Sequence, residues 1–67
     1  MADEIDIYRS ANLLMKQFGI EEAKNRAIRN STEMLNRNDI LGAAAWRAML
    51  RAIEELESLE RNDKPLH

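Results

Sequence analysis

Two short interruptions divide an otherwise continuous helix-favouring sequence into three segments. The first is Gly19, and the second is the polar run from Asn36 to Asp39. Elsewhere the chain has no valine, one threonine and one proline, whereas Ala, Leu, Glu, Arg, Met, Lys and Gln make up over half of the residues. These seven residue types have high helix propensity. We therefore expect an all-α, three-helix domain with helices over about 3–18, 20–36 and 40–61, followed by a flexible tail at 62–67.

The first segment, residues 3–18, has one apolar face. Asp3 is placed to cap the start of the helix, and Gly19 suits the left-handed conformation that ends one. At 100° per residue, Ile7, Tyr8, Ala11, Leu14, Met15 and Phe18 share a single side. Ile5 and Leu13 point away from that side. In a chain with few large apolar residues, they require either a second partner or exposure to solvent.

The second segment, residues 20–36, has a thin apolar face and a basic outer face. Its small residues Ala23, Ala27 and Ser31 form a ridge that allows another helix to approach closely. Arg26 and Arg29 lie on the opposite side, with Arg37 just beyond the segment. The turn that follows ends in Asp39, which we expect to cap the third helix.

The third segment, residues 40–61, has an apolar arc that spans roughly 200° of its circumference. The arc contains Leu41, Ala45, Trp46, Ala48, Met49, Leu50, Ala52, Ile53, Leu56 and Leu59. A helix covered on one side shows about half that width. This helix therefore either lies centrally against the other two or also packs against another copy of the chain. We expect Trp46 to be a core anchor rather than an interface residue, and Gly42 to mark a close helix crossing rather than the floor of a pocket.

The shortness of the chain favours self-association. Removing nine alanines and Met1 from the thirty apolar residues leaves twenty large apolar side chains among 67 positions. A core of this size rarely yields more than about 3 to 5 kcal/mol. The chain has no cysteine, and its one histidine is His67, so neither a disulfide nor a zinc site is available for support. We expect a protein-interaction module that forms a homodimer or docks on a larger protein. Its candidate interface is Ile5, Leu13, Leu41, Ala45, Met49, Ala52, Leu56 and Leu59.

The sequence lacks the residues that enzymatic catalysis usually requires. Ser10, Ser31 and Ser58 have no internal histidine to act as a base, and neither Gly19 nor Gly42 belongs to a glycine-rich phosphate loop. The acids Glu54, Glu55, Glu57 and Glu60 are expected on the solvated side of the third helix. We therefore expect no catalytic residues, no cofactor, no metal site and no small-molecule substrate. The acidic start and the absence of a long apolar run also predict a cytoplasmic protein without membrane contact.

The distribution of charge supports one alternative function. The formal net charge is −2 and the pI about 5.3, yet residues 24–51 carry six basic and two acidic side chains. Arg26, Arg29 and Arg37 on the second helix would form a nucleic-acid face. An acidic pI is unusual for nucleic-acid-binding domains, and the third helix is too apolar to read a groove. A small nucleic-acid-binding regulator is therefore the alternative to the interaction module.

Parts of the sequence also match the pattern of a known family. The run from Ile7 to Gly19 ends in Lys-Gln-Phe-Gly, Gly42-Ala43 precedes Trp46, and Ala52 to Leu56 follow. The chain resembles a family of short, uncharacterised alphaproteobacterial proteins that share a Lys-Gln-x-Gly helix end and a later Gly-Ala-x-x-Trp helix. Members often carry His where Phe18 stands and Gly where Asn38 stands. The resemblance implies a helical fold and a bacterial source, and it implies no activity.

Overall fold

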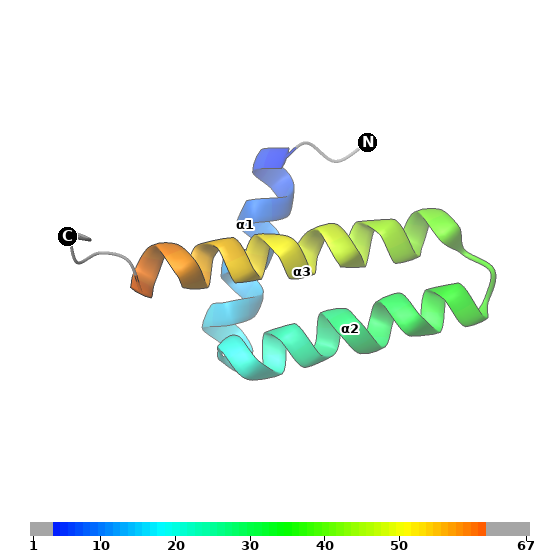
Figure 1. Cartoon of the computed structure of the whole chain (residues 1–67), viewed down its shortest axis with the longest axis horizontal. Helices are drawn as coiled ribbons and strands as arrows, with labels where there is room; N and C mark the ends of the chain where they lie inside the picture. Colours follow the sequence, from blue (N-terminus) through cyan, green and yellow to red (C-terminus); the bar gives the residue numbers. More distant parts are fainter. Residues whose placement is uncertain (1–3, 62–67) are drawn as a thin grey trace.

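The computed structural model describes residues 4–61, which form three α-helices (Figure 1). They are α1 (Glu4–Phe18), α2 (Ile20–Asn36) and α3 (Ile40–Arg61), and the described residues contain no strand. The all-α, three-helix prediction is confirmed, with α1 described from one residue later than expected. The expected cap Asp3 and the expected tail 62–67 lie outside the described residues.

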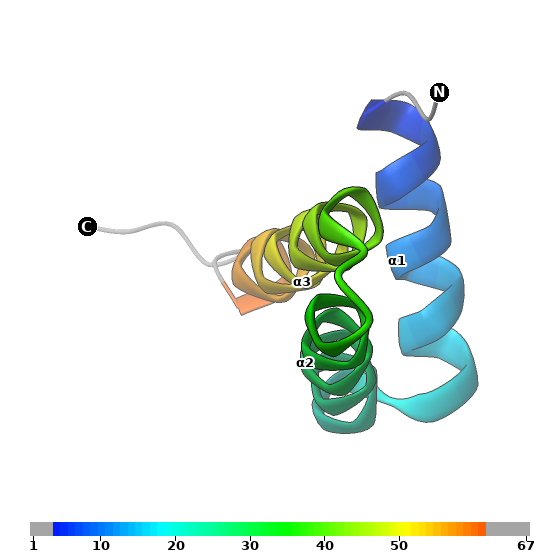
Figure 2. The ribbon, with the colours of Figure 1, turned by 90° about the vertical axis from the view of Figure 1, so that its right-hand side faces the viewer.

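Helices α2 and α3 run antiparallel as a hairpin, and α1 crosses both of them at a steep angle (Figures 1 and 2). The α2–α3 contact is the most extensive of the three helix pairs. Figure 1 shows that α1 crosses the half of the hairpin that contains the start of α2 and the end of α3. Among residues 4–61, no helix crosses the other half of the hairpin, next to the α2–α3 turn.

The core is built mainly from alanine. Ile53 is the one large side chain of the described residues that is fully buried, and Trp46 is partly buried and packs against the core, as expected. The predicted small ridge on α2 is buried, and the Ser31 hydroxyl there donates a hydrogen bond to the Ile28 carbonyl at 2.8 Å. The buried small residues are Ala11, Ala23, Ala27, Ser31, Ala43 and Ala52. Side chains of this size let the helix backbones approach closely, so the core is filled by closely packed helices rather than by large side chains.

Gly19 alone connects α1 to α2. Its N–H donates to the Met15 carbonyl at 2.8 Å, and its own carbonyl accepts the Ala23 N–H at 2.9 Å. The backbone has φ 85° and ψ 164°, which lies outside the left-handed helical region that we expected. This conformation is essentially restricted to glycine, and it turns the chain directly from one helix into the next.

The left-handed helix end occurs instead at Asn38, after α2. Asn38 has φ 66°, its N–H donates to the Leu35 carbonyl at 2.9 Å, and the Asp39 N–H donates to the Met34 carbonyl at 2.7 Å. These two bonds form a Schellman motif, which is usually completed by glycine at this position. Asparagine adopts the conformation more readily than other side chains because its amide can bond locally.

Asp39 caps α3, as predicted. Its Oδ1 accepts a hydrogen bond from the Gly42 N–H at 2.9 Å. A Cβ on Gly42 would lie 2.5 Å from Asp39 Oδ2 and 3.1 Å from Sδ of Met34 on α2. Gly42 therefore makes room both for the capping carboxylate and for α2, and it lines neither of the two surface depressions described below.

Candidate functional site

One side of α3 is a line of apolar residues that α1 covers only in the middle, and four of them, Leu41, Ala45, Ala52 and Leu59, belong to the predicted interface. Leu41, Ala45, Ala48, Ala52 and Leu59 share one side of α3, spaced i, i+4, i+7, i+11 and i+18. Ala48 and Ala52 line a shallow groove together with Ile7 and Tyr8 of α1, which shows that this side faces α1. We call these five residues the α3 strip. Because α1 crosses it at Ala48 and Ala52, the strip is uncovered at both ends.

The eight candidate interface residues divide into three groups by burial. Ala52 is 3% exposed and belongs to the core, so its assignment to an open surface was wrong. Met49 and Leu56 are partly buried and pack against that core. The remaining five, which are Ile5, Leu13, Leu41, Ala45 and Leu59, are exposed. Among the large side chains of this group, Leu41 is the most exposed at 84%, followed by Leu59 at 69%.

The candidate nucleic-acid face is occupied by acids from the same helix. Arg26 Nε lies 3.2 Å from Glu22 Oε2, and Arg29 reaches the same oxygen at 3.5 Å. Arg37 pairs with Glu33 at 3.4 Å. A phosphate group would have to displace these carboxylates. The structure brings Arg26 and Arg29 together on one acid and places Arg37 with a different one.

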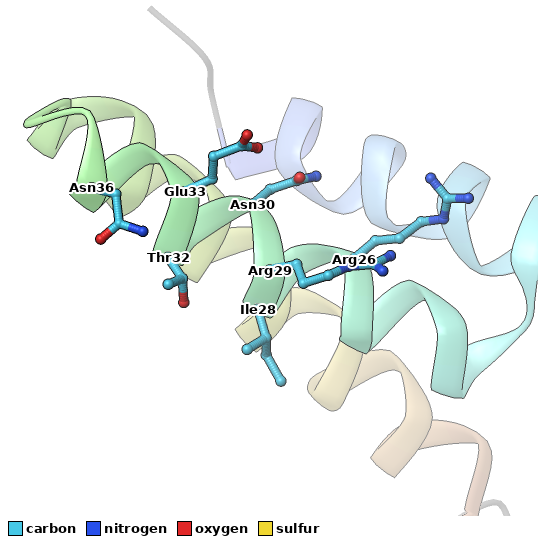
Figure 3. A pocket seen from close by; sticks show the side chains of 7 residues that line it. All are labelled: Arg26, Ile28, Arg29, Asn30, Thr32, Glu33 and Asn36. Atoms are coloured by element: carbon cyan, nitrogen blue, oxygen red, sulfur yellow. The ribbon is translucent and has the colours of Figure 1, made fainter.

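This face of α2 carries a depression lined by residues of one helix only (Figure 3). Asn30 and Glu33 extend to one side, whereas Ile28, Thr32 and Asn36 extend to the other. The outer surface of a single helix is convex, so it cannot enclose a ligand as binding pockets do. The depression does not add support for a small-molecule or phosphate site.

Arg26 also stabilises the corner between α1 and α2. Its guanidinium carbon lies 3.9 Å from the centre of the Phe18 ring, the last residue of α1. The buried Nε makes no hydrogen bond, so its 3.2 Å approach to Glu22 is a charge contact with unfavourable hydrogen-bond geometry. Cation–π contacts of this kind contribute about 0.5 to 1 kcal/mol at exposed sites. Arg26 therefore has a structural role that its sequence position did not reveal.

Lys24 and Glu57 form an ion pair between α2 and α3, with Nζ and Oε1 2.6 Å apart. Their side chains are only 23% and 13% exposed, so the expectation that Glu57 lies on a solvated face was wrong. The hydrogen bond to Glu57 raises the pKa of Lys24 above its ordinary value of 10.5, opposed in part by burial. Glu55 is also engaged, because it accepts a hydrogen bond from the Tyr8 hydroxyl of α1. Helical periodicity cannot predict such pairs, since they depend on which helix becomes the neighbour.

The described residues contain no group of three or more His, Cys, Asp or Glu side chains arranged to hold a metal ion. Among residues 4–61, no helix has the length and apolar character needed to span a membrane. What the arrangement does offer is uncovered apolar surface at both ends of the α3 strip and on the outer side of α1.

The fold and these surfaces define the chain as a small three-helix protein with an incompletely covered central helix. No family model, curated protein or solved structure matches it.

Proposed function

We propose that this chain is a protein-interaction module that associates with a second copy of itself and has no catalytic activity of its own. The observation that carries the proposal is the exposure of Leu41, Leu59, Ile5 and Leu13, each more than 60% exposed. Isolated exposed leucines are common on protein surfaces. Here Leu41 and Leu59 lie at the two ends of a side of α3 that is already buried in its middle, so a partner at one end would extend an existing contact. Ile5 and Leu13 add apolar surface on the outer side of α1.

The magnitudes favour a weak dimer. Fully burying a leucine or isoleucine contributes about 1.5 to 3 kcal/mol, so residues already partly covered contribute about 1 to 2 kcal/mol each. Three such residues from each of two copies give about 6 to 12 kcal/mol. Association costs about 4 to 15 kcal/mol in lost freedom of motion. The balance corresponds to dissociation constants in the micromolar range or weaker, and self-association should depend strongly on concentration.

Sedimentation equilibrium over about 5 to 500 μM tests the proposal. We expect the weight-average mass to rise from that of one chain toward that of two. Circular dichroism at the lowest concentration reports whether the dissociated chain remains helical. A folded chain that stays monomeric across the whole range would contradict self-association, and a partner of different sequence would then be required.

The alternative role in nucleic-acid binding has less support, because Arg26, Arg29 and Arg37 each have an acid within 3.5 Å. A gel-shift assay with bulk DNA and RNA at low salt separates the two roles. We expect no shift, since binding requires protein cations that are free to neutralise the phosphates and so release the counterions condensed on the nucleic acid. Salt-sensitive binding to either polymer would favour the alternative.

A further inference from the structure

We propose that the partner occupies the uncovered half of the hairpin with its own α1, so that the two α1 helices lie side by side between two hairpins. This inference rests on the proposed self-association and specifies its geometry. Four observations support it: the space beside α1, the exposed residues of the strip and of α1, the charges at each end of α1, and the flank of α1 that faces the open half.

The open half of the hairpin has the width of one helix. Helix α3 has 22 residues, and α1 crosses it at Ala48 and Ala52. Residues 40–47 precede that crossing and extend about 12 Å along the helix axis, which matches a helix diameter of about 10 to 12 Å. A second helix therefore fits beside α1 on the same side of the hairpin (Figure 1).

The surface of this open half is apolar on α3 and polar on α2. Leu41 and Ala45 continue the strip that α1 covers further along, and both are exposed. On α2, Asn30 and Glu33 extend to the same side as Arg26, which stacks on Phe18 of α1 (Figure 3). An occupant should therefore be apolar where it meets α3 and polar or cationic where it meets α2.

Helix α1 of a second copy meets these requirements with Ile5 in the half that would lie over α3 and Lys16 in the half that would lie over α2, where Leu13 also lies. Ala11 faces its own core, while Leu13 and Ile5 are 61% and 65% exposed. Two copies related by a two-fold axis parallel to α1 would each place this outer side on the other's open half. The interface is then isologous, because both copies contribute the same surface, and assembly stops at two chains.

The charges agree with this direction. The N-terminal half of α1 lies over α3, where Tyr8 bonds to Glu55, and its last residue Phe18 contacts Arg26 of α2. A partner α1 running the same way would carry Asp6 toward α3 and Lys16 toward α2. On α3, Arg47 pairs with no acid among the described residues. On the half of α2 next to the turn, the exposed acid is Glu33, which Arg37 contacts at 3.4 Å. Opposite charges therefore meet at both ends of the docked helix.

The flank of α1 that would meet the partner's α1 is also defined. Tyr8 lies on the flank that reaches Glu55, toward the C-terminal end of α3. Asn12 shares that flank at i+4, whereas Ser10, Leu14 and Gln17 lie on the opposite flank, toward the open half. Ser10 is small and exposed, so two α1 helices can approach closely there.

Disulfide trapping tests this geometry, because the chain has no cysteine of its own. We expect Ser10→Cys to form a covalent dimer under mild oxidation about tenfold faster than the matched control Asn12→Cys, since a disulfide requires Cα atoms within about 7 Å. Both positions are exposed on α1, so neither variant should disturb the fold. Faster trapping of Asn12→Cys would overturn the arrangement.

A second pair of variants uses the two ends of the α3 strip. Leu41→Lys should weaken dimerisation about tenfold or more, because a charge would be buried in an apolar contact. Leu59→Lys lies on the same side of α3 beyond α1 and should change the dissociation constant less than about threefold. A dimer that dissociates with Leu59→Lys and not with Leu41→Lys would overturn this inference and leave the proposed self-association standing. A chain that is monomeric at about 500 μM would overturn both.

Discussion

Lys24 on α2 donates a hydrogen bond from its ammonium group to Glu57 on α3, with 2.6 Å between Nζ and Oε1. The pair joins the two helices of the hairpin at the end farthest from the turn, where no backbone connection holds them together. Because both side chains are partly buried, salt screens this pair less than the exposed pairs on α2.

The ion pair predicts a loss of stability at alkaline pH. The pKa of Lys24 is raised in the folded state by its hydrogen bond to Glu57. The folded chain therefore binds the Lys24 proton more tightly than the unfolded chain does. The stabilisation is fully present below the ordinary pKa of 10.5 and is lost as the pH rises through the folded-state pKa. Urea midpoints measured from pH 8 to about pH 12 at one protein concentration should fall over this alkaline range.

Lys24→Met provides the control for that experiment, because it keeps the apolar stem and removes the charge. It should be less stable than the wild type at pH 8, and the two midpoints should converge as the pH rises. Other groups that titrate in this range are common to both proteins and cancel in the difference. A constant difference between the two proteins up to pH 12 would contradict the role assigned to Lys24.

Ile53→Ala should unfold the protein. Ile53 is fully buried, and isoleucine-to-alanine changes in cores cost about 2 to 5 kcal/mol. A domain of this size has about 3 to 5 kcal/mol in total, so the loss removes most of the stability. Far-ultraviolet circular dichroism at 25 °C should show loss of helix, and the fluorescence of Trp46, which packs against this core, should shift to that of an exposed indole.

Leu59→Ala is the matched control on the same helix. Leu59 is 69% exposed, and surface substitutions usually change stability by less than about 0.5 kcal/mol. A similar loss of helix in both variants would mean that the core is not centred on Ile53.

The helices could be predicted from the sequence because their boundaries depend on local chemistry. The residues that set each boundary lie within a few positions of it: Gly19 between α1 and α2, and Asn36 to Asp39 between α2 and α3. Strong helix formers occupy the segments between them. The conformation of Gly19 could not be predicted, since its ψ depends on where α2 must go to pack. For the same reason the burial of Ala52 and Glu57 was missed. Ala52 lies within the apolar arc of α3, and it is buried because α1 crosses α3 there. Glu57 lies on the polar side, and it is partly buried because Lys24 of α2 pairs with it.

Asn38→Gly should stabilise the protein by about 0.5 kcal/mol. Asn38 has φ 66° in the Schellman motif, where a side chain costs about 1 kcal/mol and glycine costs none. The greater freedom of glycine in the unfolded chain offsets part of this gain. Asn38→Ala, which cannot bond locally through an amide, should instead lower the free energy of unfolding by about 1 kcal/mol. Urea unfolding of the three proteins measures both effects, and a stabilising alanine would show that this conformation is not strained.

The cap of α3 predicts a coupling between Asp39 and Gly42. Asp39→Ala in the wild type removes the bond to the Gly42 N–H and should cost about 1 kcal/mol. Gly42→Ala would place a Cβ 2.5 Å from Asp39 Oδ2, so the carboxylate must move off the helix end. The gain of about 1 kcal/mol in helix propensity is then roughly cancelled by the lost cap.

A double-mutant cycle separates these two contributions. In the Gly42→Ala background the cap is already displaced, so Asp39→Ala should cost less than about 0.3 kcal/mol, which corresponds to a coupling of about 0.7 kcal/mol or more. The approach of Met34 Sδ to the same position, at 3.1 Å, acts equally on both Gly42→Ala proteins and does not contribute to the coupling. Additive free energies of unfolding would mean that the carboxylate still caps α3 beside the new methyl group, and Gly42 would then be required by the packing of α2 alone.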